Sequence, residues 1–132
     1  MREILFRGKQ FYNGRWIHGG LVERDGRVFI VGVSSLLRID GIEVDPKTVS
    51  QYTGLTDKNG VKVFENDIVR DCSEENEVFV VKYYAHGGYP AFDVEPEMHC
   101  DCNGLSYLME LGSAEVIGNI FDNPKLLKGG AE

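Results

Sequence analysis

Oxygen-bearing side chains and glycines are concentrated in residues 51–69, which have the sequence QYTGLTDKNGVKVFENDIV. Four residues of this stretch offer the hard oxygen ligands that Ca²⁺ prefers: Asp57, Asn59, Glu65 and Asp67. A calcium loop of the EF-hand type that began at Asp57 would need an oxygen ligand at its fifth position and glycine at its sixth. Val61 and Lys62 stand there instead. The sequence also lacks a phosphate-binding Gly-x-x-x-x-Gly-Lys-Ser/Thr string, so the stretch matches neither kind of ion-binding loop.

The dipeptide Asn59-Gly60 gives the same stretch a structural interpretation. Asn-Gly supplies the two positive φ angles of a type I′ turn, which joins antiparallel strands through a two-residue loop. Such a turn would create four cross-strand pairs: Lys58 with Val61, Asp57 with Lys62, Thr56 with Val63, and Leu55 with Phe64. The pairs are apolar at the base of the hairpin and oppositely charged near its tip. We therefore predict a β-hairpin here, with Asp67 accepting backbone N–H groups beside a turn.

Cysteine and histidine are sufficient in number for a zinc site. Cys72 and the cluster of His99, Cys100 and Cys102 would supply four ligands. Structural zinc sites use Cys-x2-4-Cys or His-x3-5-His spacings, whereas this chain has one Cys-x-Cys pair and a distant third cysteine. If Asn103-Gly104 forms a two-residue turn, Cys100 and Cys102 share one face of a strand and His99 lies on the other. We therefore expect half-buried thiols, and neither a metal nor another cofactor.

Acid–base or nucleophilic catalysis is the third chemistry that these residue types could support. Glu65 and Asp67 are two apart on an extended segment and so share a face, as a carboxylate pair does in a hydrolase. His18, His86 or His99 could act as a base for a cysteine nucleophile. No spacing links any two of these residues into one site. We therefore expect a protein that is not an enzyme, with a small metal-dependent hydrolase as the weakest alternative.

Charge is distributed unevenly along the chain, whose net charge is -7. Residues 1–40 hold seven Lys/Arg and four Asp/Glu, whereas residues 41–132 hold seven and seventeen. Because phosphate contacts need cationic side chains, a nucleic-acid surface could form only in the N-terminal third. The candidate surface combines cations with an aromatic ring on which bases could stack: Arg7, Lys9, Arg15 and Trp16, with Phe11 and Tyr12 among them.

The length and composition favour one domain in a reducing compartment. A chain of 132 residues is too short for two ordinary domains. No apolar run approaches the roughly 18 residues of a membrane helix, and the start MREILFRG alternates charged and apolar residues, unlike a signal peptide. Three cysteines, an odd number, do not suggest a disulfide framework. We therefore expect a cytoplasmic protein that does not contact a membrane.

Short β-branched and aromatic segments indicate a mainly antiparallel β fold. Predicted strands lie at 77–85, 90–94, 105–111 and 114–121. Single helical turns are predicted at Asp45-Pro46 and after Asn123-Pro124, because proline fits the first turn of a helix and Asp or Asn can cap it. Helical periodicity is otherwise scarce. The strands are expected to curl on themselves and so hide their edges.

Further Asn-Gly and Asp-Gly dipeptides predict additional hairpins. The predicted pairs are Phe11 with Trp16 and Tyr12 with Arg15 around Asn13-Gly14; Leu21 with Ile30 and Val22 with Phe29 around Asp25-Gly26; and Leu37 with Val44, Arg38 with Glu43 and Ile39 with Ile42 around Asp40-Gly41. The second hairpin would also set Arg24 opposite Arg27, so a longer loop is an alternative there.

Three blocks of the sequence resemble the YopX family of phage and prophage proteins. They are MREILFRG at the start, TVSQYTGLTDKNGVKVFENDIV at 48–69 and VIGNIFDNPKLL at 116–127. The residues that carry the resemblance are Gln51, Tyr52, Thr53, Gly54, Leu55, Asn59, Gly60, Glu65, Asp67, Ile117, Gly118 and Asn119. Asn66 stands where the family usually has glycine, and we expect the turn to be retained because Asn tolerates a left-handed conformation.

The resemblance implies a phage or prophage protein of a bacterial cytoplasm. It implies a β-hairpin subdomain at 1–44, a small SH3-like antiparallel barrel at 45–127 and a flexible tail at 128–132, and it brings no catalytic residues. We therefore expect a non-enzymatic binding or assembly module that contacts an unidentified host or phage protein and other copies of itself. The alternative is a nucleic-acid-binding protein that uses the basic N-terminal third.

Overall fold

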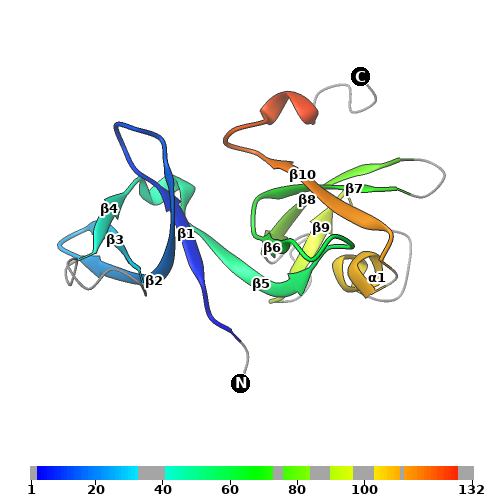
Figure 1. Ribbon diagram of the computed structural model, residues 1–132, viewed down its shortest axis with the longest axis horizontal. Coiled ribbons are helices and arrows are strands. Elements are labelled where there is room, and N and C mark those ends of the chain that lie inside the picture. The colour runs from blue at the N-terminus through cyan, green and yellow to red at the C-terminus, as the bar shows by residue number, and fades with distance from the viewer. Residues whose placement is uncertain are drawn as a thin grey trace. The chain divides into compact units, whose positions relative to one another are not determined.

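The chain divides into two compact units, Met1–Tyr52 and Thr53–Glu132, which are described separately below (Figure 1). The structure, a computed structural model, describes residues 3–32, 41–72, 76–83, 90–96, 103–110 and 112–127. Strand β5 (Ser50–Thr56) begins in the first unit and ends in the second. The predicted mainly antiparallel β fold is confirmed, whereas the subdomain bounds 1–44, 45–127 and 128–132 stay predictions.

The first unit is an antiparallel sheet with the strand order β4-β3-β2-β1-β5. Its other strands are β1 (Phe6–Lys9), β2 (Trp16–Arg24), β3 (Arg27–Val31) and β4 (Ile42–Val44). Phe29, Ile30, Val44 and Tyr52 are its buried apolar side chains. The 3-10 turn η1 (Pro46–Thr48) follows β4, and the Asp45 carboxylate accepts the Lys47 N–H at 3.0 Å, which confirms the predicted turn and its cap.

The hairpin between β2 and β3 has the predicted two-residue turn. Asp25 and Gly26 have φ angles of 56° and 77°, as a type I′ turn requires, and the cross-strand pairs match those predicted. Arg24 does stand opposite Arg27. The two cations are tolerated because each has another partner: the Arg24 guanidinium lies 4.6 Å from the centre of the Phe29 ring, and Arg27 donates two hydrogen bonds to Glu43 on β4.

The hairpin between β1 and β2 differs from its prediction. Lys9, not Phe11, stands opposite Trp16, and Gln10 N donates to Arg15 O at 2.9 Å. The loop therefore has four residues, 11–14, between that hydrogen-bonded pair. Asn13 lacks the positive φ that a type I′ turn needs; its side-chain oxygen instead accepts the Arg15 N–H at 3.0 Å.

A glycine allows the strands of the first unit to approach closely. A Cβ atom added at Gly19 on β2 would lie 2.1 Å from the Val31 carbonyl oxygen on β3. Strand β4 pairs with β3 through Ile42 to Val44. The hairpin predicted around Asp40-Gly41 lies largely in residues 33–40, outside the described residues.

The second unit contains a four-stranded antiparallel sheet with the order β10-β7-β8-β9. Its elements after β5 are β6 (Lys62–Phe64), β7 (Asp67–Asp71), β8 (Val78–Tyr83), β9 (Phe92–Glu95), α1 (Gly104–Glu110), β10 (Ala114–Asn119) and η3 (Pro124–Leu126). In the described part of the chain this sheet ends at β10 and β9 and does not close, so the predicted SH3-like barrel is not confirmed. The strands predicted at 77–85, 90–94 and 114–121 and the turn after Pro124 are confirmed, with shifted ends.

Residues 105–110 of the segment 105–111, which we predicted as a strand, belong to the helix α1 instead. Leu105, Leu108 and Met109 are buried, and their spacing places them on one helical face. Asn103 caps the helix, since its side-chain oxygen accepts the Ser106 N–H at 2.8 Å. The core that the helix shares with the sheet contains Val63, Val69, Phe79, Val81, Val94, Leu105, Leu108, Met109 and Ala114. None of the described helices is long and apolar enough to cross a membrane.

Candidate functional site

The β5–β6 loop, residues 57–61, is the hairpin predicted in the polar stretch, but with a different turn. Asp57 N donates to Val61 O at 2.8 Å, and Gly60 N donates to Asp57 O at 3.0 Å. These bonds define a three-residue loop that ends in Gly60, whose φ is 82°. Asp57 therefore pairs with Val61 and not with Lys62, so the predicted cross-strand register is wrong by one residue.

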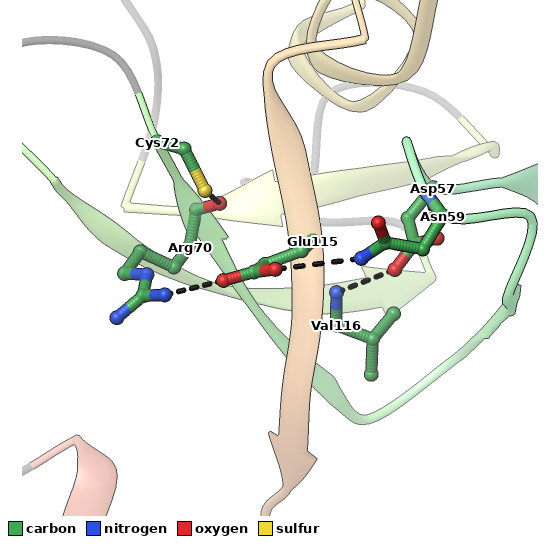
Figure 2. A network of polar contacts seen from close by, with 6 residues as sticks. All are labelled: Asp57, Asn59, Arg70, Cys72, Glu115 and Val116. Carbon is green, nitrogen blue, oxygen red and sulfur yellow. Dashed lines mark hydrogen bonds and ion pairs between the residues drawn. The ribbon is translucent and has the colours of Figure 1, made fainter.

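The Asp57 carboxylate causes this shift, because it binds the loop's own backbone. Its Oδ1 atom accepts the N–H groups of Asn59 at 2.8 Å and Val61 at 2.9 Å. Its Oδ2 atom accepts the Val116 N–H of β10 at 2.9 Å (Figure 2). Asp57 is only 5% exposed. This buried carboxylate accepts three backbone N–H groups and so connects the hairpin to β10, in which Val116 lies 59 residues later in the chain.

The same loop covers the outer edge of β10. Lys58 N donates to Ala114 O at 3.2 Å, while Val116 N is bound by Asp57. Asn59 Nδ2 also reaches Glu115 Oε1 at 3.4 Å. Because these backbone groups of β10 face away from β7, they would otherwise be available to another strand. Asp57 and Lys58, together with the signature residue Asn59, thus cover this sheet edge.

Glu115 continues this network onto β7, where it forms an ion pair with Arg70 directly across the ladder (Figure 2). The hydrogen bond from Arg70 lowers the pKa of the Glu115 carboxyl, with smaller contributions from Lys58 and Asn59. The reciprocal bond raises the pKa of Arg70. Cys72 Sγ lies 3.7 Å from Arg70 O, so this thiol belongs to the structural network.

Asp67, an acidic residue of the signature, also binds backbone. It is 2% exposed, and its Oδ2 atom accepts the Phe64 N–H at 2.7 Å, as predicted for an aspartate beside a turn. Asn66 has a φ of 75°, which confirms the expected left-handed conformation. Its backbone N–H donates to Val81 O at 2.7 Å and its carbonyl accepts the Ile120 N–H at 3.0 Å. This turn therefore holds β8 and the end of β10.

The opposite end of the sheet, β9, is closed in a similar way. Asp93 Oδ1 accepts the Val94 N–H at 2.8 Å and the Leu105 N–H of α1 at 3.2 Å. Asn103 Nδ2 donates to Phe92 O at 2.8 Å. Carboxylate and amide side chains thus occupy backbone groups at both ends of the four-stranded sheet. Sequence reasoning missed Asp93 and Asn103, because it interpreted Asn103-Gly104 as a hairpin turn.

The third signature block forms a tight turn after β10. Asn119 Oδ1 accepts the N–H groups of Phe121 at 3.0 Å and Asp122 at 2.9 Å. Asn123 folds back so that its Oδ1 accepts the Asn119 N–H at 3.2 Å. A Cβ atom added at Gly118 would lie 2.5 Å from that oxygen. Close packing against Asn123 therefore explains the glycine at 118, and the hydrogen bonds of its own side chain explain Asn119.

Asp57, Asp67 and Cys72 take part in structural contacts among the described residues. No group of three His, Cys, Asp or Glu residues that could hold a metal ion occurs in the described ranges. The carboxylates of Asp57 and Asp67 are occupied by backbone donors, and His18 and Cys72 belong to different units. His86, His99, Cys100 and Cys102 lie outside the described residues.

The structure brings together three of the four residues of the candidate nucleic-acid surface. The Arg7 guanidinium lies 4.7 Å and the Lys9 amine 5.6 Å from the centre of the Trp16 ring, while Arg15 is exposed. Arg7 is only 8% exposed. Partial burial and the charge of Arg7 lower the pKa of His18, which stands opposite Arg7. Trp16 therefore serves first as a partner for the protein's own cations.

Two aromatic side chains that we expected in the ladder are exposed on the β1–β2 loop. Phe11 is 60% exposed and Tyr12 is 93% exposed. The loop beneath them is held by its own hydrogen bonds: Asn13 Nδ2 donates to Gln10 Oε1 at 2.9 Å, and Gly14 N donates to Gln10 O at 3.2 Å. Asn13 binds the loop backbone through its side chain and so favours a four-residue loop, which exposes Phe11 and Tyr12. The dipeptide Asn-Gly alone predicts a two-residue turn and does not reveal this exposure.

The family model of the YopX protein matches residues 6–128, nearly the whole chain. The chain belongs to the YopX family. Among solved structures, protein EF1440 from Enterococcus faecalis is similar, with a TM-score of 0.65 and 22% sequence identity over 96% of this chain and 99% of that one. This likeness shows a shared fold. No curated protein matches. The residues that mark the YopX family in this sequence lie in β5, the β5–β6 loop, the turn before β7 and the end of β10.

Proposed function

We propose that the protein is a non-enzymatic binding module whose β1–β2 loop contacts a partner protein. One observation carries the proposal: Phe11 and Tyr12 are exposed side by side on a loop that is already ordered by internal hydrogen bonds. Aromatic side chains dominate the energetics of protein interfaces, and an ordered loop loses little conformational entropy when it binds. Phage or prophage origin and a cytoplasmic location, which the YopX resemblance implies, remain predictions.

Quantitative affinity capture from a lysate of the bacterial host tests this proposal. The full chain, the double variant Phe11→Ala/Tyr12→Ala and the control Tyr107→Ala serve as baits. Tyr107 is 45% exposed on α1, so the control removes an aromatic side chain of comparable exposure from the other unit. A protein retained by the wild type and the control but lost with the double variant is expected. Equal recovery by all three baits would contradict the proposal.

Self-association is part of the same proposal and has its own test. The described ends of the four-stranded sheet are occupied by side chains and by the β5–β6 loop, so association through β10 or β9 would first require those contacts to open. We therefore expect copies to associate through the β1–β2 loop. Light scattering should give a mass above that of one chain for the wild type and a monomer for the double variant. A monomeric wild type would refute self-association.

A further inference from the structure

The charges around the β1–β2 loop are cationic, which restricts the chemistry of its partner. Between Glu3 and Glu23 the sequence contains no Asp or Glu, but it contains Arg7, Lys9 and Arg15. Asp45 is an acidic residue in contact with β1: its backbone N–H donates to Lys9 O, and its carboxylate caps η1. An anionic group approaching the two exposed aromatic side chains would therefore meet net positive charge.

The positions of the cations favour a peptide carboxylate over a nucleic-acid backbone. Arg7 is buried against Trp16, and Lys9 is half-buried beside the same ring, so Arg15 is the exposed cation of the three. Nucleic-acid affinity depends on neutralising several phosphates, and it would be opposed by the overall charge of -7. A protein contact needs only one or two aromatic anchors and one well-placed cation.

We propose that the β1–β2 loop binds an acidic segment of its partner, with Phe11 and Tyr12 contacting an apolar side chain and Arg15 pairing with a carboxylate. The inference rests on the proposed function and adds the chemical class of the partner. The exposed aromatic side chains supply apolar area, and the guanidinium supplies a planar donor pair that matches a carboxylate. Lys9 and the buried Arg7 reinforce the positive potential without direct contact.

Selection of peptides from a random phage-display library on the immobilised full chain tests the inference. Sequences enriched on the wild type over Phe11→Ala/Tyr12→Ala should contain Asp or Glu beside an apolar or aromatic residue. The affinity of a synthetic selected peptide, measured by fluorescence polarisation, should fall at least about tenfold with the double variant. It should fall severalfold with Arg15→Gln and also as salt is raised. Arg24→Gln, which removes an exposed cation elsewhere in the same unit, is the matched control and should have no effect.

The possible outcomes separate the inference from the proposed function. Loop-dependent peptides without acidic residues, or equal affinity for wild type and Arg15→Gln, would overturn the acidic partner and leave the proposed function standing. Peptides that bind the double variant as well as the wild type would overturn both. A fluorescent oligothymidine that binds the wild type at low salt and not the double variant would assign the loop to nucleic acid. A fall of the light-scattering mass of the wild type to that of one chain when the selected peptide is added in excess would assign the site to a second copy.

Discussion

The β1–β2 loop and the β5–β6 loop both contain an Asn-Gly dipeptide, yet one points outward and the other is bound to a neighbouring strand. In the first, Asn13 binds only residues of its own loop, and Phe11 and Tyr12 are exposed. In the second, Asp57 is buried and also binds β10. The difference lies in the side chain that binds the loop backbone: the Asp57 carboxylate has spare acceptor sites for a second element, whereas the Asn13 amide is already used locally.

The two units extend this contrast. The first unit holds eight Lys/Arg and six Asp/Glu, packs strands closely at Gly19 and matches its cations with aromatic rings. The second holds six Lys/Arg and fifteen Asp/Glu, and it uses carboxylate and amide side chains to occupy the ends of its sheet. Most of the signature residues of the family lie in the second unit, and so mark how that unit is built, while the surface that we propose for binding lies in the first.

Asp57→Ala should have the largest effect on stability, and it tests whether the β5–β6 loop depends on β10. Three N–H groups would lose their acceptor, and we expect the free energy of unfolding to fall by about 4 kcal/mol. Asn13→Ala, the matched change in the other loop, should cost less than about 1 kcal/mol. Urea unfolding followed by far-UV circular dichroism measures both. Equal losses would mean that the two loops do not differ as described.

Gly19→Ala tests whether close backbone packing stabilises the first unit. The new methyl group would meet the Val31 carbonyl oxygen, so the strands must separate, at a cost of about 3 kcal/mol. Trp16 is the only tryptophan of the chain and lies in the first unit, so its fluorescence reports the loss there. Gly20→Ala is the control, since no atom lies within 4 Å of the added Cβ. A similar urea midpoint for both variants would count against the packing argument.

Gly118→Ala probes the turn after β10 in the second unit. The added Cβ would displace the Asn123 side chain and break its bond to Asn119 N, which should cost about 2 kcal/mol. In an Asn123→Gly background the same change should cost much less, because the atoms it meets are gone. The coupling energy comes from the four urea unfolding curves. Additive effects would show that Gly118 is required for another reason.

Glu115→Gln should lower stability slightly at neutral pH and not at all in acid. Because Arg70 lowers the pKa of Glu115 in the folded state, its stabilising contribution is present above the unfolded value of about 4.3 and disappears as pH falls through the folded pKa. The melting temperatures of wild type and variant should therefore approach each other as pH falls below about 4.3. A difference that stays constant through this range and below it would point to packing instead of charge.

His18→Gln gives the smallest expected change, and it concerns the first unit. Burial and Arg7 lower the pKa of His18, so the folded state resists protonation. The wild type should lose stability as pH falls through about 6.5, the ordinary value, towards the folded pKa, because the unfolded chain binds the proton first. In the variant, the urea midpoint followed by Trp16 fluorescence should vary less between pH 7 and 5. Parallel profiles would show that another group titrates there.

Alternation and turn dipeptides are local signals, and they predicted the fold class and the existence of most hairpins. The family was predicted from the resemblance of three sequence blocks. It did not predict loop lengths. Asp25-Gly26 forms the expected type I′ turn, whereas Asn13 and Asp57 bind nearby N–H groups through their side chains and so favour longer loops. These alternatives differ by single hydrogen bonds, which the dipeptide does not specify.

The helix α1 and the exposed aromatic residues were missed for related reasons. Leu105, Leu108 and Met109 do have helical spacing, but seven residues are too few for a clear periodic signal. Phe11 and Tyr12 have strand-like character, and only the real length of the loop places them beyond the ladder. The exposure of these two residues therefore depends on the register of β1 and β2, which the sequence did not determine.

Strand β5 contributes residues to both units, so its length is constrained. Its first residues pair with β1, where Gln51 stands opposite Phe6, and Thr53 Oγ1 donates to Val63 O at 2.8 Å at the start of the second unit. Inserting or deleting one residue between them would reverse the faces of side chains on one side of the change. Surface loops tolerate insertions and deletions, but we expect selection against them in β5. The Gln-Tyr-Thr-Gly-Leu segment should therefore accept substitutions more readily than a change in length.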